Sequence, residues 1–279
     1  MAKKYLLFDI GATKTRFAVS ADGRNLRSLR IVPTPQKFDA AMKVFDLTIQ
    51  GIVSGRLSAA AGGVPGPADY KQGIMLKTPN LPAWKGKPLK KTLEKIFNAK
   101  VYLENDALMS ALGEANYGAG KGYRKVLYVT VSTGVNAKLI VDGKISELSG
   151  SGVGHQIIDA SGPKCPHCGV RGTWESYVSG AALRRRYGKA PRDILDKKIW
   201  DEEAKWLALG IANSIRHWSP QIVVMGGGIA LSGKVSLVSV NSYLKQFMRT
   251  FPAVPQVKKA ILGDLGGLRG ALAYLRQQK

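Results

Sequence analysis

The chain has 279 residues, of which 45% are hydrophobic and 22% charged, a composition typical of folded globular proteins and not of disordered ones. No apolar stretch approaches the roughly 18 residues of a membrane-spanning helix, and the apolar run that ends at Asp9 is too short for a signal peptide. The two cysteines lie close together, which excludes a disulfide framework and predicts a reducing, cytoplasmic location with no membrane partner.

The net charge is unusual, because 42 basic and 19 acidic residues give +23. Such a charge attracts polyanions, including nucleotides, polyphosphate and nucleic acid. A basic proteome or a high-salt cell interior explains it equally well. The basic residues are spread along the chain without interleaved aromatic residues, so the charge alone does not predict a nucleic-acid-binding protein.

The predicted elements alternate between strands and helices, which indicates an α/β fold. Strands are expected at 5–9, 15–20, 27–32, 57–64, 101–103, 126–131, 137–141, 222–225 and 257–262. Helices are expected at 37–52, 89–97, 107–117, 174–178, 181–187, 201–218, 240–251 and 268–276. The repeated order predicts two lobes with a cleft for a small molecule between them. One lobe comprises 1–107 with the C-terminal helix 266–279, and the other comprises 108–265.

The first chemical motif is Asp9-Ile-Gly11-Ala-Thr13-Lys14, where a strand ends in a carboxylate and a turn follows. Backbone N–H groups, a hydroxyl and an ammonium in one turn suit phosphate oxygens and Mg²⁺. The alternative is an ordinary hairpin turn with a solvated lysine.

The segment Glu104-Asn105-Asp106 follows a short predicted strand and opens the helix 107–117. Asn or Asp at this position caps free helical N–H groups. A carboxylate at the edge of a cleft also suits a general base that accepts the proton of a substrate hydroxyl. The two interpretations are compatible.

Two further turns suit the close approach of a nucleotide. Ser132-Thr133-Gly134 separates two predicted strands, and Gly226-Gly227-Gly228 links a buried strand to the chain that follows. Glycine lets the backbone approach phosphate or nucleoside closely. A tight turn without a ligand is the alternative for both.

The segment Cys165-Pro-His167-Cys168-Gly169 presents two thiols in one turn, and His155 lies ten residues before it. Two thiolates and an imidazole are ligands that Zn²⁺ prefers, and a closed structural site has four ligands. His167 is the candidate for the fourth position. Two reduced thiols in a loop, without metal, are the alternative.

In order and spacing these motifs resemble the ROK family of sugar kinases and sugar-responsive repressors, which has the actin-like ATPase fold. The resemblance also includes Gly63-Val-Pro-Gly66-Pro, Pro79-Asn-Leu-Pro-Ala-Trp84, Ala111-Leu-Gly-Glu114, Gly172-Thr-Trp-Glu175, Ser179-Gly180 and Leu262-Gly-Asp-Leu-Gly266. In the repressors a DNA-binding domain precedes the first phosphate motif. The motif begins here at Asp9, so the kinase branch is expected, without sequence-specific DNA binding.

The resemblance implies a role for each matching residue. Asp106 would be the general base, and the sugar would contact the residues Asn105, His155, Glu175 and Gly66. ATP and Mg²⁺ would contact Asp9, Gly11, Thr13, Lys14, Thr133 and Gly134, with Gly227 and Gly228 beside the adenosine. Zinc would be held by His155, Cys165 and Cys168, and a homodimer is expected.

Three departures from the family pattern leave other functions open. Gly152 stands where the family has a sugar-binding glutamate, the second phosphate turn lacks its later glycines, and Thr173 replaces a third cysteine. The leading hypothesis is ATP-dependent phosphorylation of a hexose or N-acetylhexosamine. The alternatives are a protein that binds sugar or nucleotide without transferring phosphate, and a kinase that uses polyphosphate as its donor.

Overall fold

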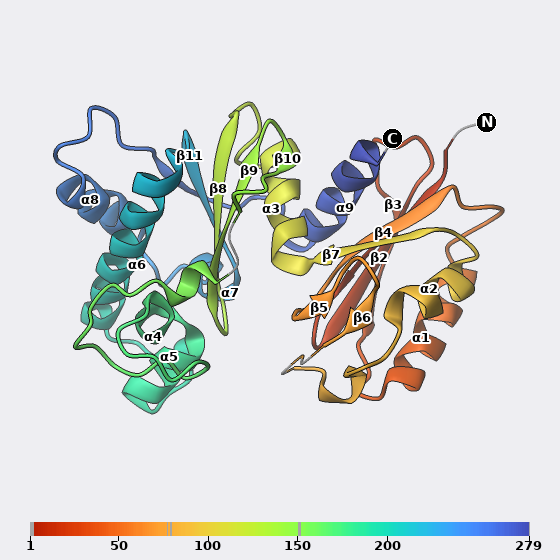
Figure 1. Ribbon diagram of the computed structural model, residues 1–279, viewed down its shortest axis with the longest axis horizontal. Helices are drawn as coiled ribbons and strands as arrows, with labels where there is room; N and C mark the ends of the chain where they lie inside the picture. Colours follow the sequence, from red (N-terminus) through yellow and green to blue (C-terminus); the bar gives the residue numbers. More distant parts are fainter. Residues whose placement is uncertain (1–2, 77, 79, 150–151, 279) are drawn as a thin grey trace. The chain divides into compact units, whose positions relative to one another are not determined.

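The computed structural model describes residues 3–76, 78, 80–149 and 152–278 (Figure 1). The chain divides into two compact units. Unit 1 comprises Met1–Tyr117 and Leu262–Lys279, and unit 2 comprises Gly118–Ile261. The expected division at residue 107 falls at the start of a helix that packs within unit 1. Among the described residues, no helix is both long and apolar enough to cross a membrane.

Unit 1 is built on a five-stranded sheet in the order β3-β2-β1-β4-β7. Its strands are β1 (Tyr5–Ile10), β2 (Lys14–Ser20), β3 (Arg27–Pro33), β4 (Ala59–Val64) and β7 (Val101–Asn105). The first three are antiparallel, whereas β4 and β7 run parallel to β1. Because parallel strands end at the same edge of a sheet, Asp9 and Asn105 lie at one edge, on either side of β4.

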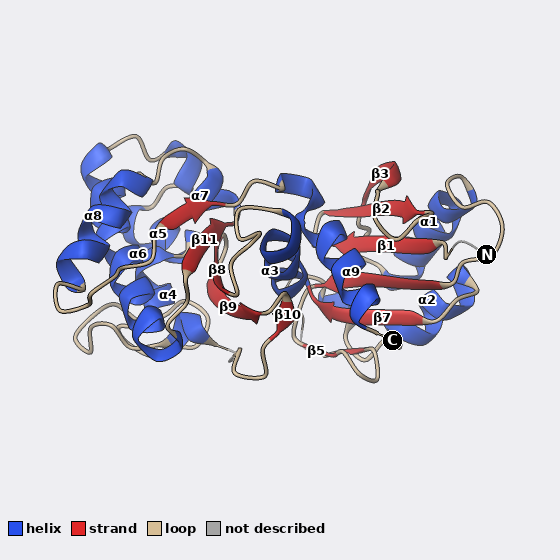
Figure 2. Ribbon diagram, turned by 90° about the horizontal axis from the view of Figure 1, so that it is seen from above, coloured by secondary structure: helices blue, strands red, loops and turns tan. Residues whose placement is uncertain are grey.

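Helices cover both faces of this sheet (Figure 2). They are α1 (Phe38–Gln50), α2 (Leu89–Phe97), α3 (Asp106–Tyr117) and α9 (Gly266–Gln277). Side chains alternate along a strand, so Leu6 and Phe8 lie in opposite cores from Leu7. The first core includes α1 and α2, and the second includes Met109 of α3 and Leu268 of α9. Shorter elements of unit 1 are β5 (Ala68–Asp69), β6 (Ile74–Met75), and the 3₁₀ helices η1 (Pro82–Trp84) and η4 (Gly263–Leu265).

Helices α3 and α9 approach very closely through glycines. A Cβ atom added at Gly113 would lie 2.2 Å from the carbonyl oxygen of Gly266, and one at Gly270 would lie 1.7 Å from that of Met109. Only residues without a side chain fit there. This contact fixes α3, and with it Asp106 at its first turn, against α9.

Unit 2 repeats the sheet topology of unit 1, in the order β10-β9-β8-β11-β12. Its strands are β8 (Lys125–Val131), β9 (Val135–Val141), β10 (Lys144–Ile145), β11 (Ile222–Gly226) and β12 (Val257–Lys259). Again three strands are antiparallel and two are parallel to the first. The helical elements are η2 (Val153–His155), α4 (Trp174–Val178), α5 (Gly180–Tyr187), η3 (Pro191–Asp193), α6 (Lys197–Trp218), α7 (Gly228–Leu231) and α8 (Leu237–Phe247). Trp174 and α6 pack on β8 in one apolar core.

Two helices begin earlier than their apolar periodicity predicts, because polar side chains cap them. The Asp196 carboxylate accepts a hydrogen bond from the Lys198 N–H at the start of α6. The Ser236 hydroxyl accepts one from the Ser239 N–H at the start of α8. Such caps satisfy N–H groups that have no partner within the helix. The expected mixed α/β fold is confirmed.

Candidate functional site

Two carboxylates lie together at the carboxyl edge of the unit 1 sheet. Asp9 is near the end of β1, and Asp106 begins α3 directly after β7. A Cβ atom added at Gly63 would lie 2.9 Å from the Asp106 Cα and 3.3 Å from an Asp9 carboxylate oxygen, so both residues line the same part of β4. Burial raises the pKa of Asp106 to about 6. Burial and the charge of Asp106 raise the pKa of Asp9 to about 7.

Asn105 and Asp106 combine capping with orientation. The Leu108 N–H donates a hydrogen bond of 3.2 Å to Asn105 Oδ1, as in a helix cap. The Asn105 amide donates to Asp106 Oδ1 over 3.1 Å, and the Ala107 N–H donates to the same oxygen over 2.8 Å. Both bonds go to Oδ1 and fix the orientation of the carboxylate.

Tyr70 contacts Asn105 beside the two carboxylates and was not identified from the sequence. Its hydroxyl oxygen accepts a hydrogen bond of 3.3 Å from Asn105 Nδ2. A Cβ atom added at Gly66 would lie 2.5 Å from that hydroxyl and 3.5 Å from Asn105 Nδ2, so the turn containing Gly66 lies against both. No local sequence pattern links Tyr70 with Asn105, because the contact depends on the pairing of β4 with β7.

The turn between β1 and β2 presents two exposed polar residues, Thr13 and Lys14. The Gly11 N–H donates to the Lys14 carbonyl over 3.0 Å, which closes the turn. A Cβ atom added at Gly11 would lie 2.9 Å from that carbonyl oxygen, so a side chain there would strain it. The predicted hairpin is present, and the Thr13 and Lys14 side chains are exposed on it.

Arg16 lies beside Asp9 and belongs to none of the sequence motifs. The two residues face each other in the β1–β2 register. Arg16 Nη1 is 3.7 Å from Asp9 Oδ2, and Nη2 forms an ion pair with Asp264 of η4. The signal that would have found it is the strand register, which pairs a carboxylate with a guanidinium.

In unit 2, the predicted second phosphate turn connects β8 with β9. Thr133 is exposed, and the Ser132 N–H donates to the Gly134 carbonyl over 2.8 Å. The Gly180 N–H at the start of α5 donates to the Ser132 carbonyl over 2.8 Å. A Cβ atom added at Gly134 would lie 2.7 Å from Glu175 Oε2. The structure therefore brings Gly134 and Glu175 together.

The glycines after β11 have different surroundings. Gly227 has φ +90° and a Cβ atom there would lie 2.4 Å from the Val131 carbonyl oxygen, so the turn needs glycine for its own geometry. No heavy atom lies within 4 Å of a Cβ placed at Gly228 among the described residues. Gly228 therefore leaves open space at the start of α7.

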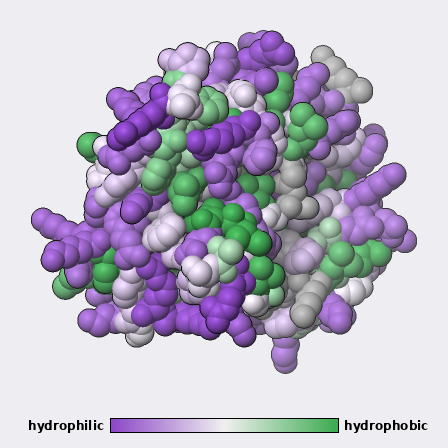
Figure 3. All heavy atoms as spheres, turned by 60° about the vertical axis from the view of Figure 1, so that its left-hand side comes forward, coloured by the Kyte–Doolittle hydropathy of each residue, from purple (hydrophilic) through white to green (hydrophobic). Residues whose placement is uncertain are grey.

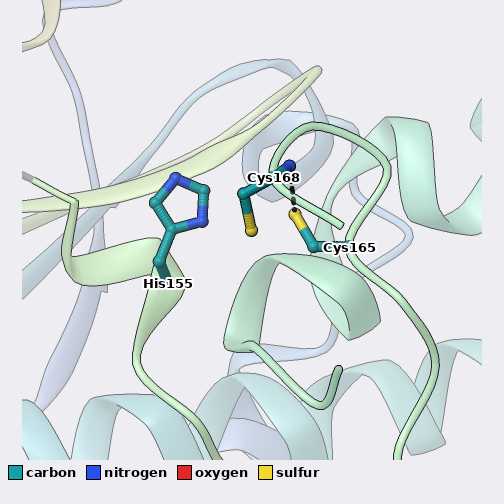
Figure 4. Close-up of side chains that lie close together, drawn as sticks. All are labelled: His155, Cys165 and Cys168. Carbon is teal, nitrogen blue, oxygen red and sulfur yellow. Dashed lines mark hydrogen bonds between the residues drawn. The ribbon is translucent and has the colours of Figure 1, made fainter. Parts of the chain in front are cut away.

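The two cysteines and His155 point toward one another (Figure 4). One nitrogen of His155 and both Sγ atoms all lie within 4.8 Å of each other. The Cys168 N–H donates to Cys165 Sγ over 3.5 Å. Burial raises the pKa of the Cys165 thiol, so a cation would be needed to stabilise its thiolate. Two sulfurs and an imidazole at this spacing fit a zinc ion.

His167 and Thr173 have other partners. His167 Nδ1 is 2.5 Å from Glu175 Oε1, and these two residues form a second close group with Cys165. Thr173 is fully buried, and its hydroxyl accepts a hydrogen bond from the Ser176 N–H at the start of α4. The residue in place of a third cysteine is thus a helix cap.

Comparison with known proteins agrees with the motifs. Residues 5–278 match the family described as the ROK family. The glucokinase of Thermotoga maritima is 27% identical, over 99% of this chain and 98% of the glucokinase. The N-acetyl-D-glucosamine kinase of Escherichia coli O127:H6 is 30% identical, over 96% of this chain and 97% of the kinase. The crystal structure of a Streptomyces griseus ROK glucokinase with glucose and AMPPNP superposes with a TM-score of 0.77, at 26% identity, covering 99% of this chain and 100% of that one. The resemblance seen in the motifs is confirmed: the chain belongs to the ROK family and has the actin-like ATPase fold of its sugar kinases.

Proposed function

We propose that this protein transfers the γ-phosphoryl group of ATP to a hydroxyl of a hexose or N-acetylhexosamine. The observation that carries the proposal is the Asp106 carboxylate, which is held by Asn105 and has a pKa raised by burial to about 6. Such a group is ionised at neutral pH and basic enough to accept a proton in the transition state. The names of the glucokinase and N-acetylglucosamine kinase relatives support this substrate class.

In the proposed reaction, Asp106 accepts the proton of the sugar hydroxyl while the oxygen of that hydroxyl attacks the γ-phosphorus. The bond from that phosphorus to the bridging oxygen breaks, and ADP leaves. Asn105, Gly66, His155 and Glu175 are the proposed sugar contacts. Positioning and electrostatic stabilisation supply most of the acceleration in phosphoryl transfer.

The triphosphate is proposed to contact the two hairpin turns, through Gly11, Thr13 and Lys14 in one and Thr133 and Gly134 in the other. Gly227 and Gly228 are proposed to lie beside the adenosine, where the open space at Gly228 supports a close approach. Asp9 offers the oxygen ligand that Mg²⁺ prefers. When bound, Mg²⁺ would neutralise negative charge on the phosphates.

A structural zinc ion is proposed at His155, Cys165 and Cys168, whose donor atoms converge. His167 is the candidate for a fourth ligand from the sequence alone, whereas in the structure its Nδ1 lies 2.5 Å from Glu175 Oε1. Metal analysis of the purified protein tests the site: about one zinc per chain is expected, and none would leave two plain thiols. A homodimer is proposed from the family resemblance, and sedimentation analysis would test it.

The decisive experiment is an ADP-release assay across hexoses, amino sugars and N-acetyl sugars. Turnover with at least one sugar is expected, and kcat/KM should fall as the pH drops below about 6, where Asp106 becomes protonated. No ADP release with any sugar would refute the kinase proposal.

The second candidate is a protein that binds sugar or nucleotide without transfer. It is favoured by Gly152 and by the sequence Val135-Asn-Ala-Lys138, which lacks glycine after the second phosphate turn. Calorimetry that shows sugar binding beside no product with ATP or polyphosphate would select it. Product with polyphosphate alone would instead identify polyphosphate as the donor, in line with the charge of +23.

A further inference from the structure

Glu175 connects three segments of unit 2 through its two carboxylate oxygens. Oε2 accepts a hydrogen bond of 3.1 Å from the Val135 N–H, at the end of the β8–β9 turn. Oε1 is 2.5 Å from His167 Nδ1 and 3.4 Å from Cys165 Sγ. The Glu175 side chain is only 7% exposed, so these contacts decide where its charge points.

His167 is the basic side chain that contacts Glu175, and among the described residues no lysine or arginine nitrogen lies within 4.0 Å of that carboxylate. Its imidazole is 45% exposed, yet its Nδ1 is directed to the buried oxygen. His167 is not among the three residues whose ligand atoms converge at His155, Cys165 and Cys168. With Cys165 and Glu175 it forms a second group whose ligand atoms lie within 4.8 Å of one another, so its Nδ1 lies beside the Glu175 carboxylate and not in the group that contains His155.

The backbone around His167 is fixed by the cysteine turn. The Gly169 N–H donates to the Cys165 carbonyl over 3.0 Å, and the Cys165 N–H donates to the Val170 carbonyl over 2.8 Å. His167 lies inside this loop, between the two thiols. A group that fixes the two thiols would therefore also fix the His167 imidazole, which contacts Glu175.

We propose that His167 is a positioning residue, outside the zinc ligand set, that holds the Glu175 carboxylate between the cysteine turn and the β8–β9 turn for sugar recognition. The effect on sugar rests on the proposed function, whereas the placement of Glu175 does not. In this arrangement the cysteine turn acts on the Glu175 carboxylate through the His167 imidazole. Partners that orient a functional side chain in this way often change its affinity or activity 10–100-fold when removed.

The first test needs no substrate. The Val135 amide hydrogen reports the position of Glu175, because it is bonded to Oε2, and its exchange is measured by nuclear magnetic resonance in the full chain. We expect His167→Ala to speed this exchange about tenfold, because the contact that fixes Glu175 Oε1 is lost. His167→Asn, which keeps a donor, should restore most of the protection. His217→Ala is the matched control, since His217 is exposed on α6, and should change nothing. Unchanged exchange in His167→Ala would overturn the proposal.

The second test separates a positioning residue from a ligand. Zinc content and the visible spectrum of the Co²⁺-substituted protein are measured for wild type and His167→Ala. We expect equal metal content and the same Co²⁺ bands. Loss of metal or a shifted spectrum would show that His167 is a ligand and would refute the assignment.

The third test measures sugar binding by calorimetry. His167→Ala should raise the sugar Kd about tenfold and leave the Kd for ATP unchanged. An unchanged sugar Kd in the variant refutes a role in recognition. If the wild type binds no sugar, the proposed function fails, and the amide exchange and Co²⁺ spectra still decide whether His167 holds Glu175.

Discussion

The carboxylates of Asp9 and Asp106 are close in space and both are harder to ionise than ordinary aspartates. Burial is the larger cause for each, and for Asp9 the neighbouring charge of Asp106 adds to it. Arg16 acts in the opposite direction on Asp9, from 3.7 Å away. Such perturbed groups, gathered at one sheet edge, are typical of functional sites.

Replacing the proposed base tests its role directly. Asp106→Asn should reduce kcat by roughly 10²–10⁴, the usual contribution of a general base, while the sugar Kd stays within a few fold. Steady-state kinetics and calorimetry measure the two quantities. The control is Asp39→Asn, an exposed aspartate on α1. Turnover near the wild-type rate in Asp106→Asn would remove this residue from the mechanism.

Asp9 should also make stability depend on pH. In the unfolded chain its carboxyl loses a proton near pH 3.8, whereas in the folded protein it keeps it until about pH 7. As the pH rises between these two values, the free energy of unfolding should therefore fall, by at most about 1.4 kcal/mol per unit of pKa shift. Asp9→Asn removes this loss, so relative to wild type it should be more stable at pH 8 than at pH 4. Urea unfolding at both pH values measures the stability difference between Asp9→Asn and wild type. The same difference at pH 4 and pH 8 would contradict the prediction.

At the scale of elements, the structure depends on the approach of α3 to α9. Gly113 and Gly270 lie 157 residues apart in sequence, yet each contacts the backbone of the other helix. This packing holds the first turn of α3, where Asp106 lies. The same helix pair covers one face of the unit 1 sheet through Met109 and Leu268.

A single methyl group at this contact should therefore be costly. In Gly270→Ala the new Cβ would lie 1.7 Å from the Met109 carbonyl oxygen, and backbone cannot yield as a flexible side chain does. We expect a loss of about 1–3 kcal/mol or more in the free energy of unfolding, measured with urea. Gly51→Ala at the end of α1 is the control, because its nearest contact would be an ordinary 3.5 Å. Equal stability of the two variants would show that α9 can move away from α3.

Local patterns predicted the elements well, because apolar spacing reports which face is buried. Phe38, Met42, Phe45 and Ile49 are buried on α1 as their spacing indicates. The contacts of Tyr70 with Asn105 and of His167 with Glu175 follow no local rule. They depend on which strands pair and how a turn folds back, and the sequence contains no signal for either.

At the scale of the whole molecule, the excess of positive charge is uneven along the chain. Residues 71–100 contain eight lysines and one acidic residue, Glu94. This segment therefore contributes seven of the 23 net positive charges. Hydrophilic side chains cover most of the face shown in Figure 3. Lysine-rich segments attract phosphate chains by their charge.

This charge should produce salt-dependent binding to polyphosphate. Retention on immobilised polyphosphate should weaken steeply between about 50 and 200 mM salt. Replacing Lys90, Lys91 and Lys95 of α2 by alanine should reduce that dependence. The control replaces Lys197, Lys198 and Lys205 of α6, which lie near Asp196, Asp201 and Glu202 in sequence. Equal effects of the two triple variants would contradict a localised basic surface.

Because α9 packs in unit 1, the two units are expected to complete their folding in a fixed order during synthesis. Leu268, Ala271, Leu272 and Leu275 complete a core begun by β1 and β4, more than 200 residues earlier. On the ribosome, residues 118–261 emerge before α9, so unit 2 can fold while the core of unit 1 still lacks α9. A premature stop codon before Leu268 would remove the part of this core that α9 supplies and leave only α3 on that face of the first sheet. Protease digestion of stalled nascent chains should therefore cut the first 117 residues before the later segment.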